Sequence, residues 1–168
     1  YHFESNGGAG KFDIERANEL GLSKGQISQL AQGLDITTDD KSLSADSFRD
    51  EPRSGFSLMV SGDTAHGPMG FDAANLPSPP QFLLHEATFM ADKQEKATQY
   101  YHSTAADAAR HATSCKASAL ALTHYSSRFE SVSPLISEAR EHFSGSVAAT
   151  MDGDWFGIDA DGNVSHHV

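Results

Sequence analysis

Three short apolar stretches of this chain each run directly into side chains that can bind metal or move protons. They are Phe56–Val60 followed by Asp63, Gln81–Leu84 followed by His85 and Glu86, and Ala119–Thr123 followed by His124. Short apolar runs bounded by polar or turn residues are typical of buried strands. Because open α/β sheets gather their chemistry beyond the carboxyl ends of strands, we expect the three ends to build one site.

The composition is that of a globular domain with an acidic surface. Of 168 residues, 38% are hydrophobic and 21% charged, and the net charge is -11. Such a surface repels nucleic acid unless positive charge is concentrated locally or supplied by metal. No apolar run approaches the roughly 20 residues that span a bilayer. The single cysteine, Cys115, cannot form an internal disulfide, which favours a reducing, cytoplasmic location.

The chain is expected to form one partial domain over residues 1–168, with an arm near its start. Residues 10–54 contain two short helical patterns, ending at Gly21 and Gly33, and then a polar, turn-rich stretch with little core of its own. From residue 55 to residue 168, strand patterns alternate with helical ones, as in α/β folds. The chain opens at Tyr1 without an initiator methionine, so we expect it to be a cut or processed piece.

Local signals place further elements in the second region. Thr104 and Asp107 have the spacing of a capping box, which predicts an alanine-rich helix through about Ser114. Ser133-Pro134 predicts another helix, with the serine as N-cap and the proline at the first helical position. Terminal strands are expected over 147–151 and 155–158.

Two strand-end residues have the chemistry of metal ligands. The carboxylate of Asp63 can bridge two cations, and the neutral imidazole of His124 is a common zinc ligand. Alone, each residue is more often structural: the aspartate caps a turn, and the histidine forms hydrogen bonds. Ser126, Ser127 and Arg128 follow His124 and could hold an anionic group.

A second set of residues suggests proton transfer. A carboxylate such as Glu86 can orient an imidazole such as His102 and tune its pKa, which makes a proton donor. The alternatives are a structural ion pair for Glu86 and a helix-capping role for His102. The remaining histidines lack convincing spacing and are interpreted as surface or tail residues: His2, His66, His111, His142, His166 and His167. The tail that contains His166 and His167 is expected to be disordered.

Four motifs, in this order and spacing, resemble the ribonuclease Z family of the metallo-β-lactamase superfamily. They are Ser-Gly-Asp-Thr at 61–64, Leu-Leu-His-Glu-Ala-Thr-Phe at 83–89, His-Ser-Thr-Ala at 102–105, and Leu-Thr-His-Tyr-Ser-Ser-Arg-Phe at 122–129. The segment at 10–22 also resembles this family, just before its substrate-binding arm. The resemblance covers nearly the whole chain, to about Gly153.

The resemblance implies a fold and an activity. The fold would be the C-terminal half of an α/β metallo-β-lactamase fold, an αββα sandwich. The activity would be removal of 3′ trailers from tRNA precursors with two zinc ions. Asp63 and His124 match metal ligands, and Glu86 with His102 matches the pair that protonates the leaving ribose oxygen. His85 would have a supporting role, and the substrate-binding residues would be Lys24, Thr64, Ser126, Ser127 and Arg128.

The chain departs from the family pattern at two places. It lacks the family's His-x-His-x-Asp-His cluster, so this chain alone is expected to bind zinc weakly and to be inactive. It also has Gly25-Gln26 where the family arm has a Gly-Pro step, which bears on how the arm grips the tRNA elbow. The expected partners are a tRNA precursor and either a second copy of the chain or the remaining half supplied in trans.

Two other functions are compatible with the sequence. One keeps the superfamily but changes the substrate to another phosphodiester or an ester, which the acidic charge favours. The other is a catalytically dead interaction module, since loss of the histidine-rich half would expose an apolar sheet face that invites dimerisation or a partner.

Overall fold

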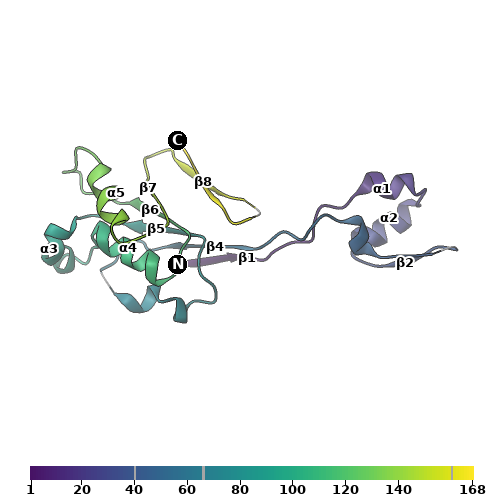
Figure 1. Cartoon of the computed structure of the whole chain (residues 1–168), viewed down its shortest axis with the longest axis horizontal. Helices are drawn as coiled ribbons and strands as arrows, with labels where there is room; N and C mark the ends of the chain where they lie inside the picture. The colour runs from purple at the N-terminus through teal and green to yellow at the C-terminus, as the bar shows by residue number, and fades with distance from the viewer. Residues whose placement is uncertain (40, 66, 160) are drawn as a thin grey trace. The chain divides into compact units, whose positions relative to one another are not determined.

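The computed structural model describes residues 1–39, 41–65, 67–159 and 161–168. They divide into two compact units, one of Asn6–Ser54 and one of Tyr1–Ser5 together with Gly55–Val168 (Figure 1). Each unit is described by itself. Among the described residues, none of the helices has the length and apolar character that crossing a bilayer requires.

The larger unit is built on a five-stranded sheet with the order β1-β4-β5-β6-β7. Strands β4 to β7 are parallel, and β1 pairs with β4 in the antiparallel sense. The parallel order brings the carboxyl ends of β4, β5, β6 and β7 to one edge, as the sequence predicted. The strands are β1 His2–Ser5, β4 Phe56–Val60, β5 Phe82–Glu86, β6 Ala119–Thr123 and β7 Ser146–Ala149.

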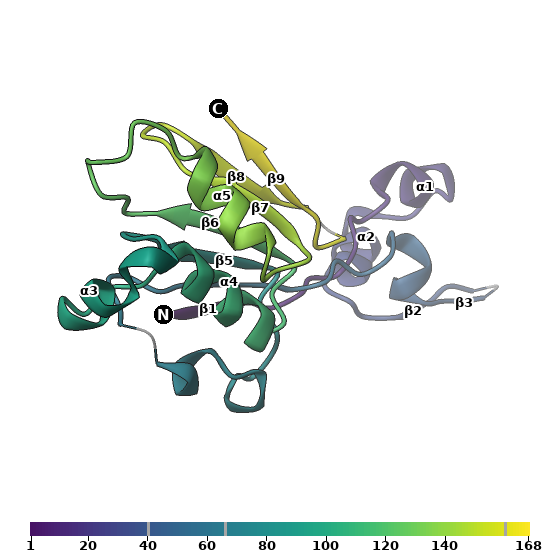
Figure 2. The same ribbon diagram turned by 60° about the vertical axis from the view of Figure 1, so that its left-hand side comes forward.

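Helices α4 (Ala105–Ser114) and α5 (Ser133–Arg140) pack on one face of this sheet (Figure 2). Most buried residues of α4 are alanines, so the helix can lie close to the strands. Leu83, Leu120 and Leu122 fill the space beneath and are at most 1% exposed. Burying each leucine contributes about 1.5–3 kcal/mol. The fully buried alanines of α4 are Ala105, Ala106, Ala108, Ala109 and Ala112.

Strands β8 (Trp155–Ile158) and β9 (Val164–His167) form an antiparallel hairpin against the other face. Phe82 of β5 contacts Phe156 of β8, with ring centroids 4.8 Å apart. The predicted exposed apolar face is therefore covered in part. The prediction of a disordered tail is also wrong, because His166 lies in β9 and its Nε2 bonds Asp154 at 2.7 Å.

Most predicted helix boundaries agree with the structure, with one correction at α5. Val132, not Ser133, is the N-cap, and no side chain caps the helix there. Ser131 takes over part of this role, since its Oγ accepts a hydrogen bond from the Ser133 N–H at 3.2 Å. Pro134 is then the second helical residue, where its missing N–H is still harmless.

Helix α3, Gln94–Gln99, precedes α4.

The smaller unit contains α1 (Ile14–Glu19), α2 (Lys24–Ala31) and a short ladder of β2 (Ile36–Thr37) with β3 (Ser42–Leu43). Its polar stretch, predicted to have little core of its own, contributes to a core that it shares with the helices. Ile36, Ala45 and Phe48 from that stretch are buried against Ala17 and Leu30 of the helices. This core was not predicted from the sequence, because the apolar residues that form it are widely spaced along the chain.

The capping box of α4 gives a first prediction. Thr104 Oγ1 accepts a hydrogen bond from Asp107 N–H, and the Asp107 carboxylate accepts one from Thr104 N–H, both at 3.1 Å. Replacing Thr104 with alanine leaves a buried N–H without its acceptor and should lower the free energy of unfolding by about 1 kcal/mol, measured in urea. Thr104→Ser keeps the hydroxyl and should lose less. Equal losses in the two variants would contradict a capping role.

Candidate active site

The carboxylate of Glu86, at the end of β5, is the centre of the site. Glu86 is 1% exposed, and its two oxygens accept hydrogen bonds from different segments. Oε1 accepts from Thr64 N–H at 3.0 Å and from His102 Nδ1 at 3.0 Å, and Oε2 accepts from Thr88 Oγ1 at 2.7 Å. Burial raises the pKa of Glu86, but donors from Thr88, Thr64, Ser103 and His102 together outweigh it, so the pKa lies below its usual value.

These contacts determine which nitrogen of each imidazole remains available. The ionised Glu86 accepts the proton of His102 Nδ1, which leaves Nε2 of His102 for chemistry. The Thr88 hydroxyl donates to Glu86, so it can accept from His124 Nδ1, 2.9 Å away. Nε2 of His124 is then the nitrogen with a lone pair. Hydrogen bonds of this kind commonly orient histidines that bind metal.

Asp63, His102 and His124 form a group that could hold a metal ion. Each offers one ligand atom, and these atoms all lie within 4.8 Å of one another. Asp63 Oδ1 is 3.5 Å from His124 Nδ1, and both side chains are about half exposed or more. The predicted ligands Asp63 and His124 are thus brought together from the ends of β4 and β6. His102, expected to transfer protons, joins the same group.

The backbone of His124 has an unusual conformation. Its φ is 54°, in the left-handed region that few residues other than glycine occupy. The residue directly follows Thr123, where β6 ends. Such a conformation is found disproportionately at functional sites.

His85 is buried on the helix side of the sheet, away from the group of Asp63, His102 and His124. Its Nδ1 donates to the Glu86 carbonyl at 2.7 Å, and its Nε2 is 2.8 Å from His111 Nδ1 of α4. The interpretation of His111 as a surface residue is wrong: it is 2% exposed and stacks on Phe71 with ring centroids 4.2 Å apart. His85 therefore positions the backbone of Glu86.

The predicted substrate-binding residues are more dispersed. Thr64 acts through its backbone, donating to Glu86 and accepting from Ser103 Oγ at 2.6 Å. Ser126 Oγ accepts from Arg128 Nη1 at 3.4 Å, and Ser127 is exposed. Lys24 is the exposed first residue of α2 in the smaller unit. His66 lies outside the described residues.

Three residues at the site were not among the sequence candidates. Thr88 links Glu86 to both histidines, Ser61 Oγ accepts from Glu86 N–H at 3.0 Å, and Ser103 bonds Thr64. Thr88 could have been found, because it follows Glu86 by two residues and lies in a conspicuous His-Glu-Ala-Thr motif. The two serines also lie in motifs, Ser61 in Ser-Gly-Asp-Thr and Ser103 in His-Ser-Thr-Ala, beside residues that were chosen as candidates.

The buried histidine pair gives a second prediction. His111→Leu removes the partner of His85 Nε2 and should lower the free energy of unfolding by about 1–3 kcal/mol in urea. His142→Leu is the matched control, because His142 is exposed and contacts Thr113 through its backbone carbonyl, which the substitution keeps. The control should change stability by at most about 0.5 kcal/mol. A His111→Leu variant as stable as the control would rule out a supporting role for the pair.

Comparisons with known proteins agree with the motifs. Over 147 residues, or 86% of its length, the chain is 37% identical to a Ribonuclease Z of Myxococcus xanthus, covering 47% of that protein. It is 39% identical over an equal stretch to a Ribonuclease Z of Halobacterium salinarum, covering 46% of it. The chain thus spans about half the length of these curated relatives. No protein-family model matches it.

A solved structure supports the predicted fold class. The metallo-β-lactamase fold protein YhfI from Bacillus subtilis aligns with 67% of this chain and 40% of its own, with a TM-score of 0.52 and 24% identity. At that identity the likeness concerns the fold alone, and it confirms the α/β class. Over most of its length, therefore, this chain is a homologue of ribonuclease Z and carries part of a metallo-β-lactamase fold.

Proposed function

We propose that this chain is part of a zinc-dependent endoribonuclease of the ribonuclease Z type, which removes 3′ trailers from tRNA precursors in the cytoplasm. The observation that carries the proposal is the convergence of Asp63, His102 and His124, within 4.8 Å of one another, beside the ionised Glu86. The similarity to Ribonuclease Z proteins over 86% of the chain supports the same activity.

The donor set fits zinc. One carboxylate oxygen and imidazole nitrogens are ligands that zinc accepts, and the Thr88 hydroxyl orients His124 for binding through Nε2. Asp63 and His124 would hold the metal, with Asp63 able to bridge two ions. When bound, zinc ions supply a water made nucleophilic near neutral pH and positive charge opposite the phosphate.

The remaining residues of the site handle the proton of the leaving group. Glu86 is ionised and accepts from His102 Nδ1, so Nε2 of His102, whose side chain is 22% exposed, remains available for proton transfer. A proton carried on Nε2 can pass to the leaving ribose oxygen as the phosphodiester bond breaks. Glu86 balances the charge of the imidazolium before the transfer, and His85 holds the Glu86 backbone in place.

The partner of this chain is proposed to be the remaining half of the enzyme or a second copy. Phe3 of β1 and Phe56 of β4 are 52% and 39% exposed on adjacent strands at one side of the sheet. Aromatic side chains in such positions favour contact with another polypeptide surface.

Zinc titration of the 168-residue chain tests the assignment of ligands. Calorimetry should show weak binding, because two protein ligands are fewer than the roughly three of a catalytic zinc site. Asp63→Asn and His124→Ala should each abolish it. His102→Ala should leave it unchanged if His102 transfers protons, and Asp92→Asn, an exposed aspartate outside the group, is the control.

A precursor-tRNA cleavage assay completes this test. The chain alone is expected to give no turnover. Tight stoichiometric zinc binding accompanied by cleavage would contradict the expectation for the isolated chain. Zinc binding unaffected by Asp63→Asn and His124→Ala would overturn the proposed metal site.

The arm gives a separate prediction. Lys24→Glu should weaken tRNA binding several-fold at low salt, with a difference that fades as salt rises. Lys24 is the first residue of α2, where an acidic side chain is favourable, so the variant should fold normally. Lys116→Glu in the larger unit controls for net charge. Equal affinities of the two variants in an anisotropy titration would argue against an arm that grips tRNA.

A further inference from the structure

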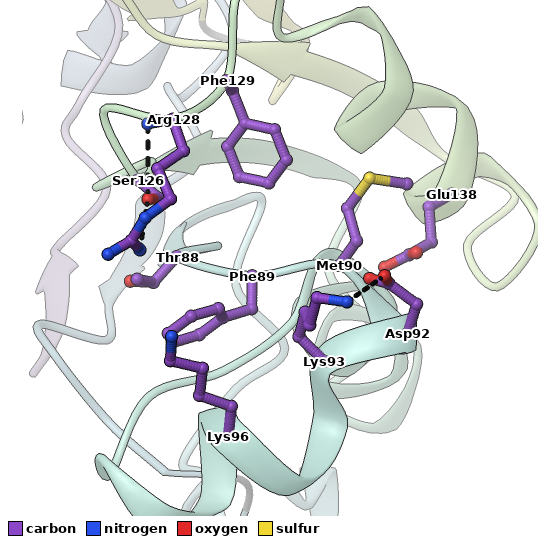
Figure 3. A pocket seen from close by; sticks show the side chains of 10 residues that line it. All are labelled: Thr88, Phe89, Met90, Asp92, Lys93, Lys96, Ser126, Arg128, Phe129 and Glu138. Atoms are coloured by element: carbon purple, nitrogen blue, oxygen red, sulfur yellow. Dashed lines mark hydrogen bonds and ion pairs between the residues drawn. The ribbon is translucent and has the colours of Figure 1, made fainter.

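An open cavity of about 420 Å³ lies beside the candidate active site (Figure 3). Its volume falls within the roughly 300–1,000 Å³ of small-ligand sites. The walls come from the loop after β5, from the segment leading into α3, and from the loop after β6. The residues that matter for its chemistry are Thr88, Phe89, Met90, Lys96, Arg128 and Phe129.

The inner walls are apolar and partly aromatic. Phe89 is 9% exposed, and Met90 and Phe129 are half-buried and pack against the main core of the larger unit. Figure 3 shows the rings of Phe89 and Phe129 on different sides of the cavity. A flat ring system is the kind of ligand that such walls accommodate, because aromatic side chains stack on it.

The charged residues of the rim are three cations, Lys93, Lys96 and Arg128, and two carboxylates, Asp92 and Glu138. Lys93 pairs with Asp92 at 2.9 Å, and the Glu138 carboxylate accepts from the backbone N–H groups of Ala91 and Ala106. Within the described part of the chain, no carboxylate forms an ion pair with Lys96 or with Arg128. In a chain of net charge -11, two such cations at one rim favour an anionic ligand.

The cavity is continuous with the catalytic residues through Thr88. This side chain lines the cavity, and its Oγ1 also contacts Glu86 Oε2 at 2.7 Å and His124 Nδ1 at 2.9 Å. A ligand seated against Phe89 and Phe129 is therefore next to the place where the phosphodiester would be cut.

We propose that this cavity binds one nucleotide of the RNA strand next to the scissile phosphate. The base lies against Phe89 and Phe129, and Lys96 and Arg128 pair with phosphate groups of the same strand. This inference rests on the proposed function and names the part of the substrate that the larger unit recognises. Stacking and backbone charge together do not read sequence, so the site accepts different bases.

Binding of a fluorescein-labelled single-stranded RNA hexamer to the whole chain, followed by anisotropy over a range of salt, tests the proposal. Phe129→Ala should weaken binding at least about fivefold without changing the salt dependence. Lys96→Gln removes one phosphate contact, so the negative slope of log K against log salt should become shallower by about 0.7. Arg140→Gln, which removes an exposed charge elsewhere in the larger unit, should change neither quantity. Urea unfolding confirms that each variant is folded.

Phe129→Leu keeps an apolar wall without an aromatic ring and should bind between the wild type and Phe129→Ala. The proposal is overturned if the wild type does not bind the hexamer. It is also overturned if Phe129→Ala and Lys96→Gln bind the hexamer with the affinity and salt dependence of the wild type. If zinc binding depends on Asp63 and His124 but substitutions in the cavity do not change hexamer binding, only this inference fails. If hexamer binding depends on the cavity but zinc does not bind, the inference holds and the proposed metal enzyme fails.

Discussion

The buried carboxylate of Glu86 is the interaction on which the site depends. An ionised group at 1% exposure is unfavourable unless hydrogen bonds replace its lost water. Here the donors come from Thr64 after β4, Thr88 after β5 and His102 before α4. The need to satisfy one charge therefore ties together three loops that are distant in sequence. The same hydrogen bonds that stabilise the fold leave the imidazole nitrogens arranged for chemistry.

Much of this arrangement follows from local signals in the sequence. The apolar run at Phe56–Val60 gave the exact bounds of β4, and the spacing of Thr104 and Asp107 predicted the capping box of α4. Both depend on neighbouring residues alone. His111 could not be placed in this way, because its burial results from α4 packing on β5 and Phe71. The N-cap of α5 was also predicted wrongly, because the helix begins one residue earlier than expected: Ser133 is its first residue, and the Ser133 N–H donates to Ser131 Oγ.

The acidic surface and the proposed RNA substrate are compatible. A net charge of -11 repels a polyanion at a distance, but binding depends on the charges close to the phosphates. Among the residues that line the cavity, Asp92 pairs with Lys93, and the Glu138 carboxylate accepts hydrogen bonds from backbone N–H groups, which stabilise its charge without cancelling it. With Lys96 and Arg128, the lining of the cavity carries three cations and two carboxylates, a local excess of positive charge on a negative protein. The amino-acid composition gives the total charge but not the positions of the charges on the surface.

The left-handed backbone of His124 restricts which residues could ever replace it. At φ 54°, branched and bulky side chains are strongly disfavoured, while asparagine, aspartate, histidine and glycine are tolerated. Three of these four carry oxygen or nitrogen donors. The backbone conformation at the end of β6 therefore limits the substitutions that are tolerated at position 124. Substitutions that the fold tolerates here mostly keep a group able to bind a cation, so this position can drift in identity with less loss of its donor chemistry.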